Sequence, residues 1–316
     1  MMLPKNRKPV LVSVVGSAGL DITLREPPSK WIGEVARDVY TQRTLLPLKS
    51  PVEMGLGGNG ASASYVMAKM GLQVQLNSPI GTDPAGNLIR NWLKEAGVQC
   101  IAPTSQSTMH ALTAVNKNGQ RFGTLQHVGH PINWPLSNQN KKSQWLLVSL
   151  PGQIPVEAFL PVKQLLKSFR KPKRTRVLDT GVGWIKKILP AKMLDLWSHV
   201  DIVSGTIEEL RYWTTCQTPE SVIQKVMTAG PHTVVIKMGA KGVAYQSTRE
   251  PYSTQSPRKL SQSDVSIGAG DAFNGALIAG LTRGQSLSES VTKAQQIATQ
   301  LVENGHGVLG WGESDI

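Results

Sequence analysis

Cysteine is scarce in this chain of 316 residues, which contains only Cys100 and Cys216. Two cysteines far apart in the sequence, without a C-x-x-C pair, argue against a zinc site and favour a reducing compartment. We therefore expect a cytoplasmic protein. A chain of this length can bury a sizeable apolar core without disulfides or metals, either as two domains or as one large α/β domain.

Long hydrophobic runs are also missing. No apolar stretch approaches the ~20 residues that a membrane-spanning helix requires, so we expect no membrane association. The beginning of the chain imitates a secretory signal, because three basic residues precede the apolar run at 10–15. That run is rich in β-branched residues and ends at Gly16, which suits a central strand of a parallel sheet equally well. We predict the strand, preceded by a short basic tail.

Acidic residues are few: 21 Asp and Glu stand against 34 Lys and Arg, which gives a formal net charge of +13. Such a balance raises nucleic acid or an acidic surface as partners. The densest basic run is KSFRKPKRTR at 167–176. Few aromatic residues that could stack on bases lie near it, and no known nucleic-acid-binding module is recognisable. We interpret the run as a solvated helix end and loop before a strand, and expect no nucleic-acid partner.

Short apolar segments alternate with helical segments along the chain. The predicted strands cover 10–15, 73–80, 145–150, 176–178, 200–203 and 233–237. This alternation predicts parallel β-α-β units with right-handed crossovers. Two stretches, 34–54 and 108–128, resemble antiparallel strands instead, and the second contains a hairpin turn at Asn118-Gly119. We predict a single α/β domain over residues 1–316, with a mostly parallel central sheet flanked by helices and a small antiparallel β lid.

The stretch GLGGNG at 55–60 matches the G-x-G-x-x-G spacing of dinucleotide-binding loops through Gly55, Gly57 and Gly60. That fingerprint requires a buried parallel strand before the glycines. The preceding LLPLKSPVEM contains two prolines and a mixture of polar residues, which is poor for such a strand. The following ASASYVMAKMG is typical of a helix that ends near Gly71. The pattern alone therefore leaves dinucleotide binding as a weak alternative.

The sharpest local signal is SIGAGDAFNGALIAGL at 266–281. Gly268, Ala269 and Gly270 predict a loop without large side chains, followed by a helix over 272–281. The N–H groups and the dipole at such a helix start can hold an anion. Asp271 could simply complement that dipole. However, a carboxylate beside an anion site is also the arrangement that phosphoryl transfer needs.

With these glycine-rich segments, the sequence resembles the ribokinase-like, or PfkB, carbohydrate kinases. Six stretches carry the resemblance in the order of the family: VVGSAGLD at 14–21, GGNGASASYVMAKMG at 57–71, IGTDPAGNLIRNWLKEAGV at 80–98, DIVSGTIEEL at 201–210, VVIKMGAKGV at 234–243 and SIGAGDAFNG at 266–275. Six stretches in the same order are far more specific than any one of them. The resemblance implies a ribokinase-like fold and ATP-dependent phosphoryl transfer.

The resemblance also implies catalytic roles. Asp271 would be the general base that takes the proton from a substrate hydroxyl as it attacks the γ-phosphate of ATP. The N–H groups of Gly268, Ala269 and Gly270 would stabilise the charge that develops there. Positioning and preorganised charge would supply most of the rate.

Further site residues follow from the same resemblance. They are Asp21, Gly57, Gly58 and Ser62 on the substrate side, Thr206, Lys237 and Gly239 along the nucleotide, and Glu209, which would organise Mg²⁺ through water. The lid would close over the substrate and exclude water. Lids in this family sometimes also form a dimer interface, which makes a homodimer through the β lid an expectation.

The sequence departs from the family pattern at four positions. Ser62 replaces an Asn that helps to hold the sugar, and Gly19 replaces a second polar residue of the first-strand motif. These changes shorten polar side chains, which favours a substrate bulkier or less hydroxylated than a simple pentose. Thr206 replaces the Asn of the N-x-x-E segment, and Val265 replaces an Asp that helps to bind a monovalent cation. The last change argues against potassium activation.

The leading hypothesis is an ATP-dependent kinase that phosphorylates a hydroxymethyl or other alcohol group of a sugar or sugar-like molecule. A nucleoside kinase, including one of the pseudouridine type, is an alternative on the same fold, and a phosphosugar kinase is less favoured. A kinase-like binding protein without turnover is the alternative from another class, and it is motivated by the four departures.

Overall fold

The structure is a computed structural model that describes residues 10–27, 50–102, 104–105, 107–116, 121–127, 142–149, 156–181, 183–257 and 267–311. Most of the predicted lid segment 34–54 lies outside these ranges, as do the predicted turn at Asn118-Gly119 and the position of Val265.

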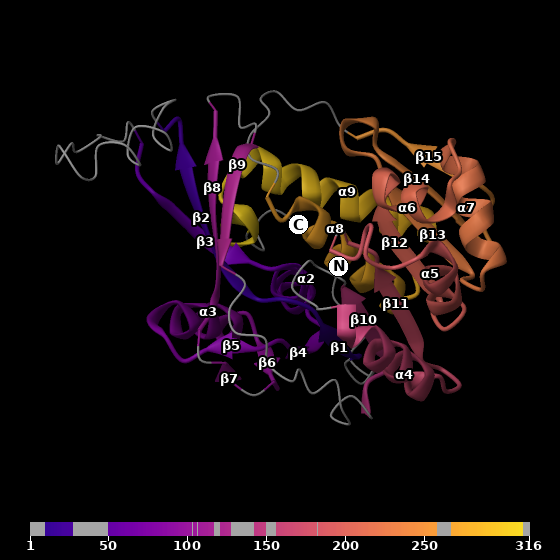
Figure 1. Ribbon diagram of the computed structural model, residues 1–316, viewed down its shortest axis with the longest axis horizontal. Coiled ribbons are helices and arrows are strands. Elements are labelled where there is room, and N and C mark those ends of the chain that lie inside the picture. The colour runs from indigo at the N-terminus through magenta and orange to yellow at the C-terminus, as the bar shows by residue number, and fades with distance from the viewer. Residues whose placement is uncertain are drawn as a thin grey trace.

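The described residues contain a sheet of nine strands in the order β15-β14-β13-β12-β11-β10-β1-β4-β6 (Figure 1). Its strands are β1 (Leu11–Val15), β4 (Gln73–Asn77), β6 (Val98–Cys100), β10 (Trp145–Ser149), β11 (Thr175–Asp179), β12 (Ile202–Thr206), β13 (Thr233–Lys237), β14 (Val243–Ser247) and β15 (Ser253–Gln255). The strands from β6 to β13 pair in parallel, whereas β14 and β15 add an antiparallel edge. The predicted mostly parallel sheet is therefore confirmed.

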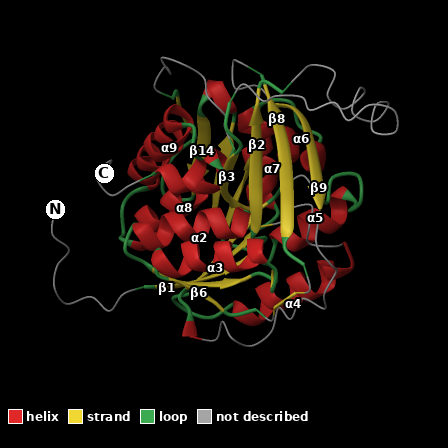
Figure 2. Ribbon diagram, turned by 90° about the vertical axis from the view of Figure 1, so that its left-hand side faces the viewer, coloured by secondary structure: helices red, strands yellow, loops and turns green. Residues whose placement is uncertain are grey.

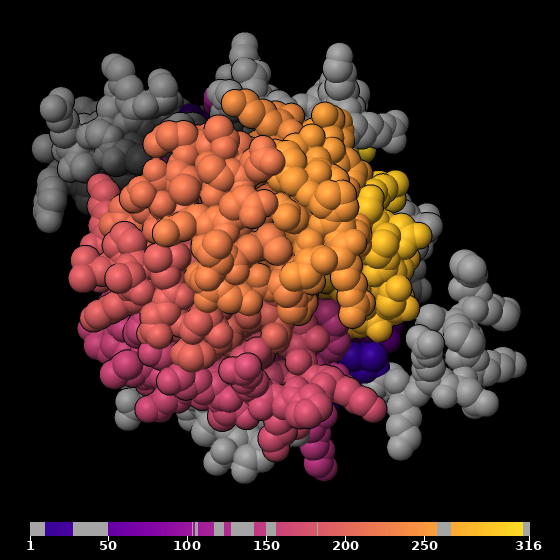
Figure 3. Space-filling view, turned by 90° about the vertical axis from the view of Figure 1, so that its right-hand side faces the viewer, coloured from indigo at the N-terminus to yellow at the C-terminus, as the bar shows by residue number. Residues whose placement is uncertain are grey.

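Helices cover both faces of this sheet, which is why its strands are apolar on both sides. On β10, Leu147 packs into one core, whereas Leu146 and Val148 pack into the other. The first core contains residues of α2 (Asn59–Lys69), α3 (Pro84–Glu95), α8 (Ala269–Thr282) and α9 (Leu287–Asn304). The second contains residues of α4 (Phe159–Phe169), α5 (Pro190–Trp197), α6 (Ile207–Thr214) and α7 (Pro219–Thr228). Figure 3 looks onto the side of the molecule that these later segments build, coloured magenta to orange.

A separate sheet of four strands has the order β3-β2-β8-β9 within the described residues. Its strands are β2 (Gly19–Arg25), β3 (Glu53–Gly57), β8 (Met109–Val115) and β9 (Arg121–His127). Figure 2 shows it standing beside the helical body. The segment 108–128 holds β8 and β9 as predicted, and β3 overlaps the end of 34–54. The sequence did not predict β2 as part of this sheet. A short parallel pair, β5 (Ile80–Gly81) and β7 (Thr104–Ser105), lies next to α3.

The GLGGNG stretch joins β3 of the small sheet to α2. Because β3 pairs antiparallel with β2 and not with the central sheet, the dinucleotide fingerprint is excluded. Gly58 is required at this turn: its φ is 84°, and a Cβ there would lie 2.6 Å from the carbonyl oxygen of Ser17. At Gly55, by contrast, an added Cβ would meet no atom within 4 Å.

The densest basic run connects α4 to β11, as the sequence predicts. The helix ends at Phe169, and the guanidinium of Arg174 lies 4.9 Å from the centre of the Phe169 ring. Arg176 is buried at the start of β11, where it forms an ion pair with Asp201 at 2.7 Å. The run therefore has a structural role at both of its ends.

Candidate active site

The candidate site lies where the carboxyl ends of the central parallel strands meet the start of α8 and the small sheet. In open α/β sheets, ligands bind at this edge. The charges of Asp21, Lys237 and Glu209 all act on Asp271, although these four residues lie in four different elements. The fold therefore brings these predicted site residues together.

The residues of the predicted anion site belong to a helix rather than to a loop before it. We predicted the helix from residue 272, but α8 begins at Ala269, and Gly268 caps it with a φ of 78°. The first hydrogen bond inside the helix runs from Ala272 N to Gly268 O at 2.9 Å. The N–H groups of Ala269, Gly270 and Asp271 precede that bond and have no acceptor within the helix. They face outward at the positive end of the helix dipole, which strengthens the predicted anion site.

Asp271 occupies the first turn of α8 and is half-buried. Burial raises its pKa, and the neighbouring carboxylate of Asp179 raises it further. The ammonium of Lys237 acts in the opposite direction, and Asp21 and Glu209 add to the increase. The resulting pKa is about 7, so this carboxyl group exchanges its proton close to neutral pH.

Lys237 ends β13 and directs its side chain into the site. Its Nζ donates to Asp179 Oδ1 at 3.0 Å and to Asn274 Oδ1 at 3.4 Å. Burial lowers its pKa, but Asp179, Glu209 and Asp271 outweigh burial and raise the pKa above its ordinary value. Lys237 is therefore a cation at neutral pH, and its contact with Asn274 holds it against α8.

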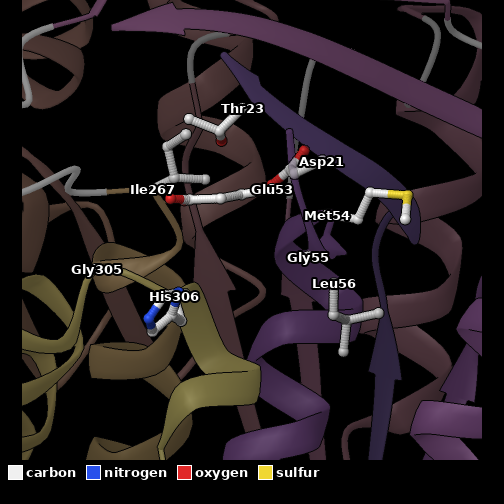
Figure 4. A pocket seen from close by; sticks show the side chains of 10 residues that line it. Asp21, Thr23, Glu53, Met54, Gly55, Leu56, Ile267, Gly305 and His306 are labelled. Carbon is white, nitrogen blue, oxygen red and sulfur yellow. The ribbon is translucent and has the colours of Figure 1, made fainter. Parts of the chain in front are cut away.

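On the substrate side, Asp21 of β2 lies against the backbone of β3. A Cβ on Gly57 would come within 2.3 Å of Asp21 Oδ1, so this carboxylate can occupy its place only beside a glycine. Asp21 lines a pocket together with Thr23 and Glu53, and His306 lies across from them (Figure 4).

Arg25 holds one wall of that pocket to the body of the protein. Its guanidinium donates to both carboxylate oxygens of Glu53, at 2.5 and 3.2 Å, and to the carbonyl oxygen of Gly305 at 3.2 Å. Because Gly305 caps the end of α9, this arginine connects the small sheet to the helical body. It also offsets the charge of Glu53 inside the pocket.

At two positions that depart from the family pattern, the structure shows which neighbouring groups the residue contacts. Ser62 is 1% exposed, and its hydroxyl donates to the carbonyl oxygen of Leu56 at 3.3 Å. The space beside Gly19 is filled by Met109, since a Cβ on this glycine would lie 2.2 Å from the methyl carbon of Met109. The positions that commonly carry polar side chains in the family are therefore packed against the protein itself.

Thr206 and Glu209 form a capping box at the start of α6. Thr206 Oγ1 accepts from Glu209 N at 3.3 Å, and Glu209 Oε2 accepts from Thr206 N at 2.9 Å. Thr180 Oγ1 donates to the same carboxylate oxygen at 2.8 Å. Thr206, predicted to lie along the nucleotide, thus uses its side chain to cap α6. Gly239, the remaining predicted nucleotide position, follows β13 with a φ of 57° and open space around it.

A metal ion would find few protein ligands here. In the part of the chain that the structure describes, no three His, Cys, Asp or Glu side chains gather into a metal-binding cluster. Glu209 offers a hard carboxylate oxygen in addition to the one used at the cap. This donor set fits Mg²⁺, which keeps several waters and takes few side chains.

Asp179, at the end of β11, is not among the site residues predicted from the sequence, and it is 4% exposed. Its carboxylate accepts from Ser149 and from Lys237, at 2.6 and 3.0 Å. An available signal was VLDTG, an acidic residue directly after an apolar strand and thus at the ligand-binding edge. Asn59, which is hydrogen-bonded to Ser149, carried no comparable signal.

The comparisons with known proteins agree with this fold. Residues 31–309 match the model of the pfkB family carbohydrate kinases. The chain therefore belongs to the PfkB family and is an ATP-dependent carbohydrate kinase. A ribokinase of Arabidopsis thaliana is 24% identical over 297 residues, which cover 88% of this chain and 76% of the relative.

Solved structures confirm the ribokinase fold. A ribokinase from Thermotoga maritima superposes with a TM-score of 0.76 at 22% identity and covers 97% of each chain. An adenosine kinase from Sinorhizobium meliloti superposes equally well, with a TM-score of 0.76 at 16% identity and 94% of each chain covered. None of the described helices combines the length and apolar character needed to cross a membrane.

Proposed function

We propose that the protein transfers the γ-phosphoryl group of ATP to a hydroxymethyl or other alcohol group of a sugar or sugar-like molecule, with Asp271 as the general base. The main observation in support of this proposal is the position of Asp271 in the first turn of α8, beside N–H groups that have no acceptor within the helix. Its pKa of about 7 lets the carboxylate accept a proton near neutral pH.

The proposed step needs little covalent chemistry from the protein. A substrate hydroxyl attacks the γ-phosphorus while its proton passes to Asp271, and the bond to the leaving phosphate of ADP breaks. The N–H groups of Ala269 and Gly270 stabilise the charge on the transferring group, with Gly268 shaping the turn. Lys237 adds a fixed positive charge beside them.

Glu209 would hold Mg²⁺ through water, and bound Mg²⁺ would neutralise charge on the ATP phosphates. Thr206 supports this role by fixing Glu209 through the capping box. Gly239, which leaves open space after β13, would lie along the nucleotide. A requirement for a monovalent cation is not part of the proposal.

Asp21, Gly57 and Gly58 would bind the acceptor, and Ser62 would support them from below through its hydrogen bond to Leu56. A sugar acceptor is supported by the solved Arabidopsis thaliana ribokinase, which is complexed with ribose and ATP. A nucleoside acceptor is the second candidate, because the adenosine kinase structure superposes as well as a ribokinase does.

The β lid would also form a homodimer. An apolar row crosses the small sheet on the side opposite Asp21, through the paired residues Met54, Ile22, Leu112 and Leu125. Met54 and Leu125 are each 59% exposed at the two ends of this row. A second copy would cover these side chains. We treat the whole chain as one α/β domain with this lid, and its two free cysteines support a cytoplasmic location.

A coupled ADP-release screen over sugars and nucleosides, with ATP and Mg²⁺, tests the proposed function. We expect turnover with at least one acceptor and its loss in Asp271→Asn. The matched control is Asp195→Asn, the same chemical change at an exposed carboxylate that pairs with Lys163 on α4. ATP binding without turnover of any acceptor would instead support the kinase-like binding protein.

A further inference from the structure

Buried and partly buried side chains form a hydrogen-bonded row beneath the candidate active site. Asn59 Nδ2 donates to Ser149 Oγ at 2.5 Å, and Ser149 Oγ donates to Asp179 Oδ2 at 2.6 Å. Lys237 Nζ continues the row to Asp179 Oδ1 and to Asn274 Oδ1. The row crosses from α2 through β10, β11 and β13 to α8, so it connects the substrate side of the site to the helix that carries Asp271.

The row fixes the cation of Lys237 against the first turn of α8. A Cβ placed on Gly270 would lie 3.9 Å from Lys237 Nζ. Asn274, which accepts from the same ammonium, is 2% exposed and follows Asp271 by three residues on the helix. Residues three apart lie on the same side of a helix, so the ammonium lies beside the proposed base.

Asp179 itself is placed where it cannot bind an acceptor. It is 4% exposed, and its two carboxylate oxygens accept from Ser149 and Lys237. A carboxylate so enclosed acts on the reaction through its charge and through the neighbour that it holds. That neighbour is the charged side chain of Lys237, which Asp179 holds at 3.0 Å.

We propose that Asp179 is a positioning residue that holds the ammonium of Lys237 beside Asp271, and that these two opposite charges together set the pH range over which Asp271 accepts a proton. This inference rests on the proposed function of Asp271. Four charged groups act on this carboxylate, namely Asp21, Asp179, Glu209 and Lys237. Lys237 carries the positive charge among these four groups, so the pKa of Asp271 depends on Lys237 and on its counterion Asp179.

The proposal predicts opposite effects for the two members of the pair. Asp179→Asn removes a negative charge while keeping the shape of the side chain, so the pKa of Asp271 falls. Lys237→Met removes the positive charge, so the pKa of Asp271 rises. We expect the acid limb of the pH profile of kcat/KM to move by about one pH unit in each direction. The double variant Asp179→Asn/Lys237→Met should return the limb toward that of the parent.

The experiment measures kcat/KM of the four proteins from about pH 5 to about pH 9, with the acceptor found in the screen. A merely structural role would lower activity at every pH without moving the limb. Superimposed acid limbs, or shifts in the same direction, would overturn the proposal. Asp195→Asn is the control that should keep the profile of the parent.

A second measurement needs no turnover. In protein labelled with ¹³C at aspartate carboxyl carbons, the resonance of Asp271, assigned by its absence in Asp271→Asn, should titrate at lower pH in Asp179→Asn than in the parent. An unchanged midpoint would contradict the proposed balance of the Asp179 and Lys237 charges at Asp271. If the midpoint shifts but no acceptor is phosphorylated, the proposed function fails while the charge balance stands. If turnover is found but the midpoints coincide, only the inference fails.

Discussion

The raised pKa of Asp271 suits its proposed role as general base but lowers the stability of the protein at neutral pH. Its pKa is raised from 3.8 to about 7, so the folded protein holds this proton more tightly than the unfolded chain. The stabilisation from this group is complete below about pH 4 and is lost as the pH rises toward 7. At neutral pH, the folded protein therefore carries an unfavourable buried charge.

Asp271→Asn should accordingly stabilise the protein in a manner that depends on pH. The gain in the free energy of unfolding should grow between about pH 4 and about pH 7 and then level off. Its upper bound is roughly 4 kcal/mol at 1.36 kcal/mol per pKa unit, and partial exposure makes a gain of about 1–3 kcal/mol more realistic. Urea unfolding at several pH values measures it.

Asp195→Asn provides the control of opposite sign. Hydrogen bonding to Lys163 lowers the pKa of Asp195, so its stabilisation is present above the ordinary carboxyl pKa and disappears as the pH falls. Its variant should therefore show no gain that grows toward neutral pH. A gain for Asp271→Asn that is constant from acid to neutral pH would contradict the raised pKa.

Gly57 should determine acceptor binding without affecting ATP. In Gly57→Ala, the new Cβ would lie 2.3 Å from Asp21 Oδ1, so the carboxylate must move. We expect KM for the acceptor to rise about tenfold or more, equivalent to about 1.4 kcal/mol, while KM for ATP stays unchanged. Steady-state kinetics with each substrate varied in turn measure both constants.

Gly123→Ala is the matched control on the same small sheet, since an added Cβ there would meet no atom within 4 Å. It should leave both constants unchanged. An unaltered acceptor KM in Gly57→Ala would remove Asp21 from the acceptor site.

Among the elements, the start of α6 lets two roles of Thr206 be distinguished: capping the helix and positioning Glu209 for Mg²⁺. Thr206→Ala removes the side-chain acceptor for Glu209 N and should cost about 1 kcal/mol of stability. Thr218→Ala removes the equivalent cap of α7 and should cost a similar amount. Only Thr206→Ala should also raise the Mg²⁺ concentration needed for half-maximal turnover, because the backbone N–H of Glu209 loses its side-chain acceptor and the helix turn that carries this carboxylate loosens.

Thr206→Ser keeps the capping hydroxyl and should restore both properties. Thermal unfolding and Mg²⁺ titrations of turnover distinguish the outcomes. Equal Mg²⁺ dependence in Thr206→Ala and Thr218→Ala would mean that the cap does not position a metal ligand.

The elements differ in how far the sequence predicts them. Strands such as β13 are continuous β-branched runs, and its predicted bounds of 233–237 match the structure. β2 escaped prediction because Gly19 and Asp21 interrupt its apolar pattern, and its pairing with β8 joins residues about ninety positions apart. The early start of α8 was missed because Gly268 and Gly270 are poor helix formers, whereas the left-handed φ of Gly268 makes it a suitable cap.

The site residues also differ in how far the sequence predicts them. The positions of Asp271 and Glu209 follow from local motifs at the starts of helices. Asp21 follows from the first-strand motif, but the structure places it within β2. The contact between Lys237 and Asp179 joins residues 58 positions apart on different strands, and no local pattern records it. The raised pKa of Asp271 depends on such contacts, so it required the fold.

At the scale of the whole molecule, the exposed row on the small sheet predicts self-association. Met54→Lys places a charge at the end of the row that is 59% exposed and should convert a dimer into a monomer. Light scattering coupled to size-exclusion chromatography measures the mass. Leu160→Lys on α4 is the control, because Leu160 is 63% exposed but lies on another surface. A parent protein that is monomeric at all concentrations would contradict the proposed lid dimer.

In the proposed reaction, α8 and Asp271 promote transfer of phosphate from ATP to an alcohol. ³¹P NMR of a reaction with the acceptor found in the screen follows this transfer. We expect a phosphate ester resonance that grows together with ADP in the parent. In Asp271→Asn, the rate should fall by about 10²–10⁴-fold while ATP binding is retained. Ester formation at the rate of the parent in Asp271→Asn, or ATP consumption that yields only inorganic phosphate with every acceptor, would contradict the proposed reaction.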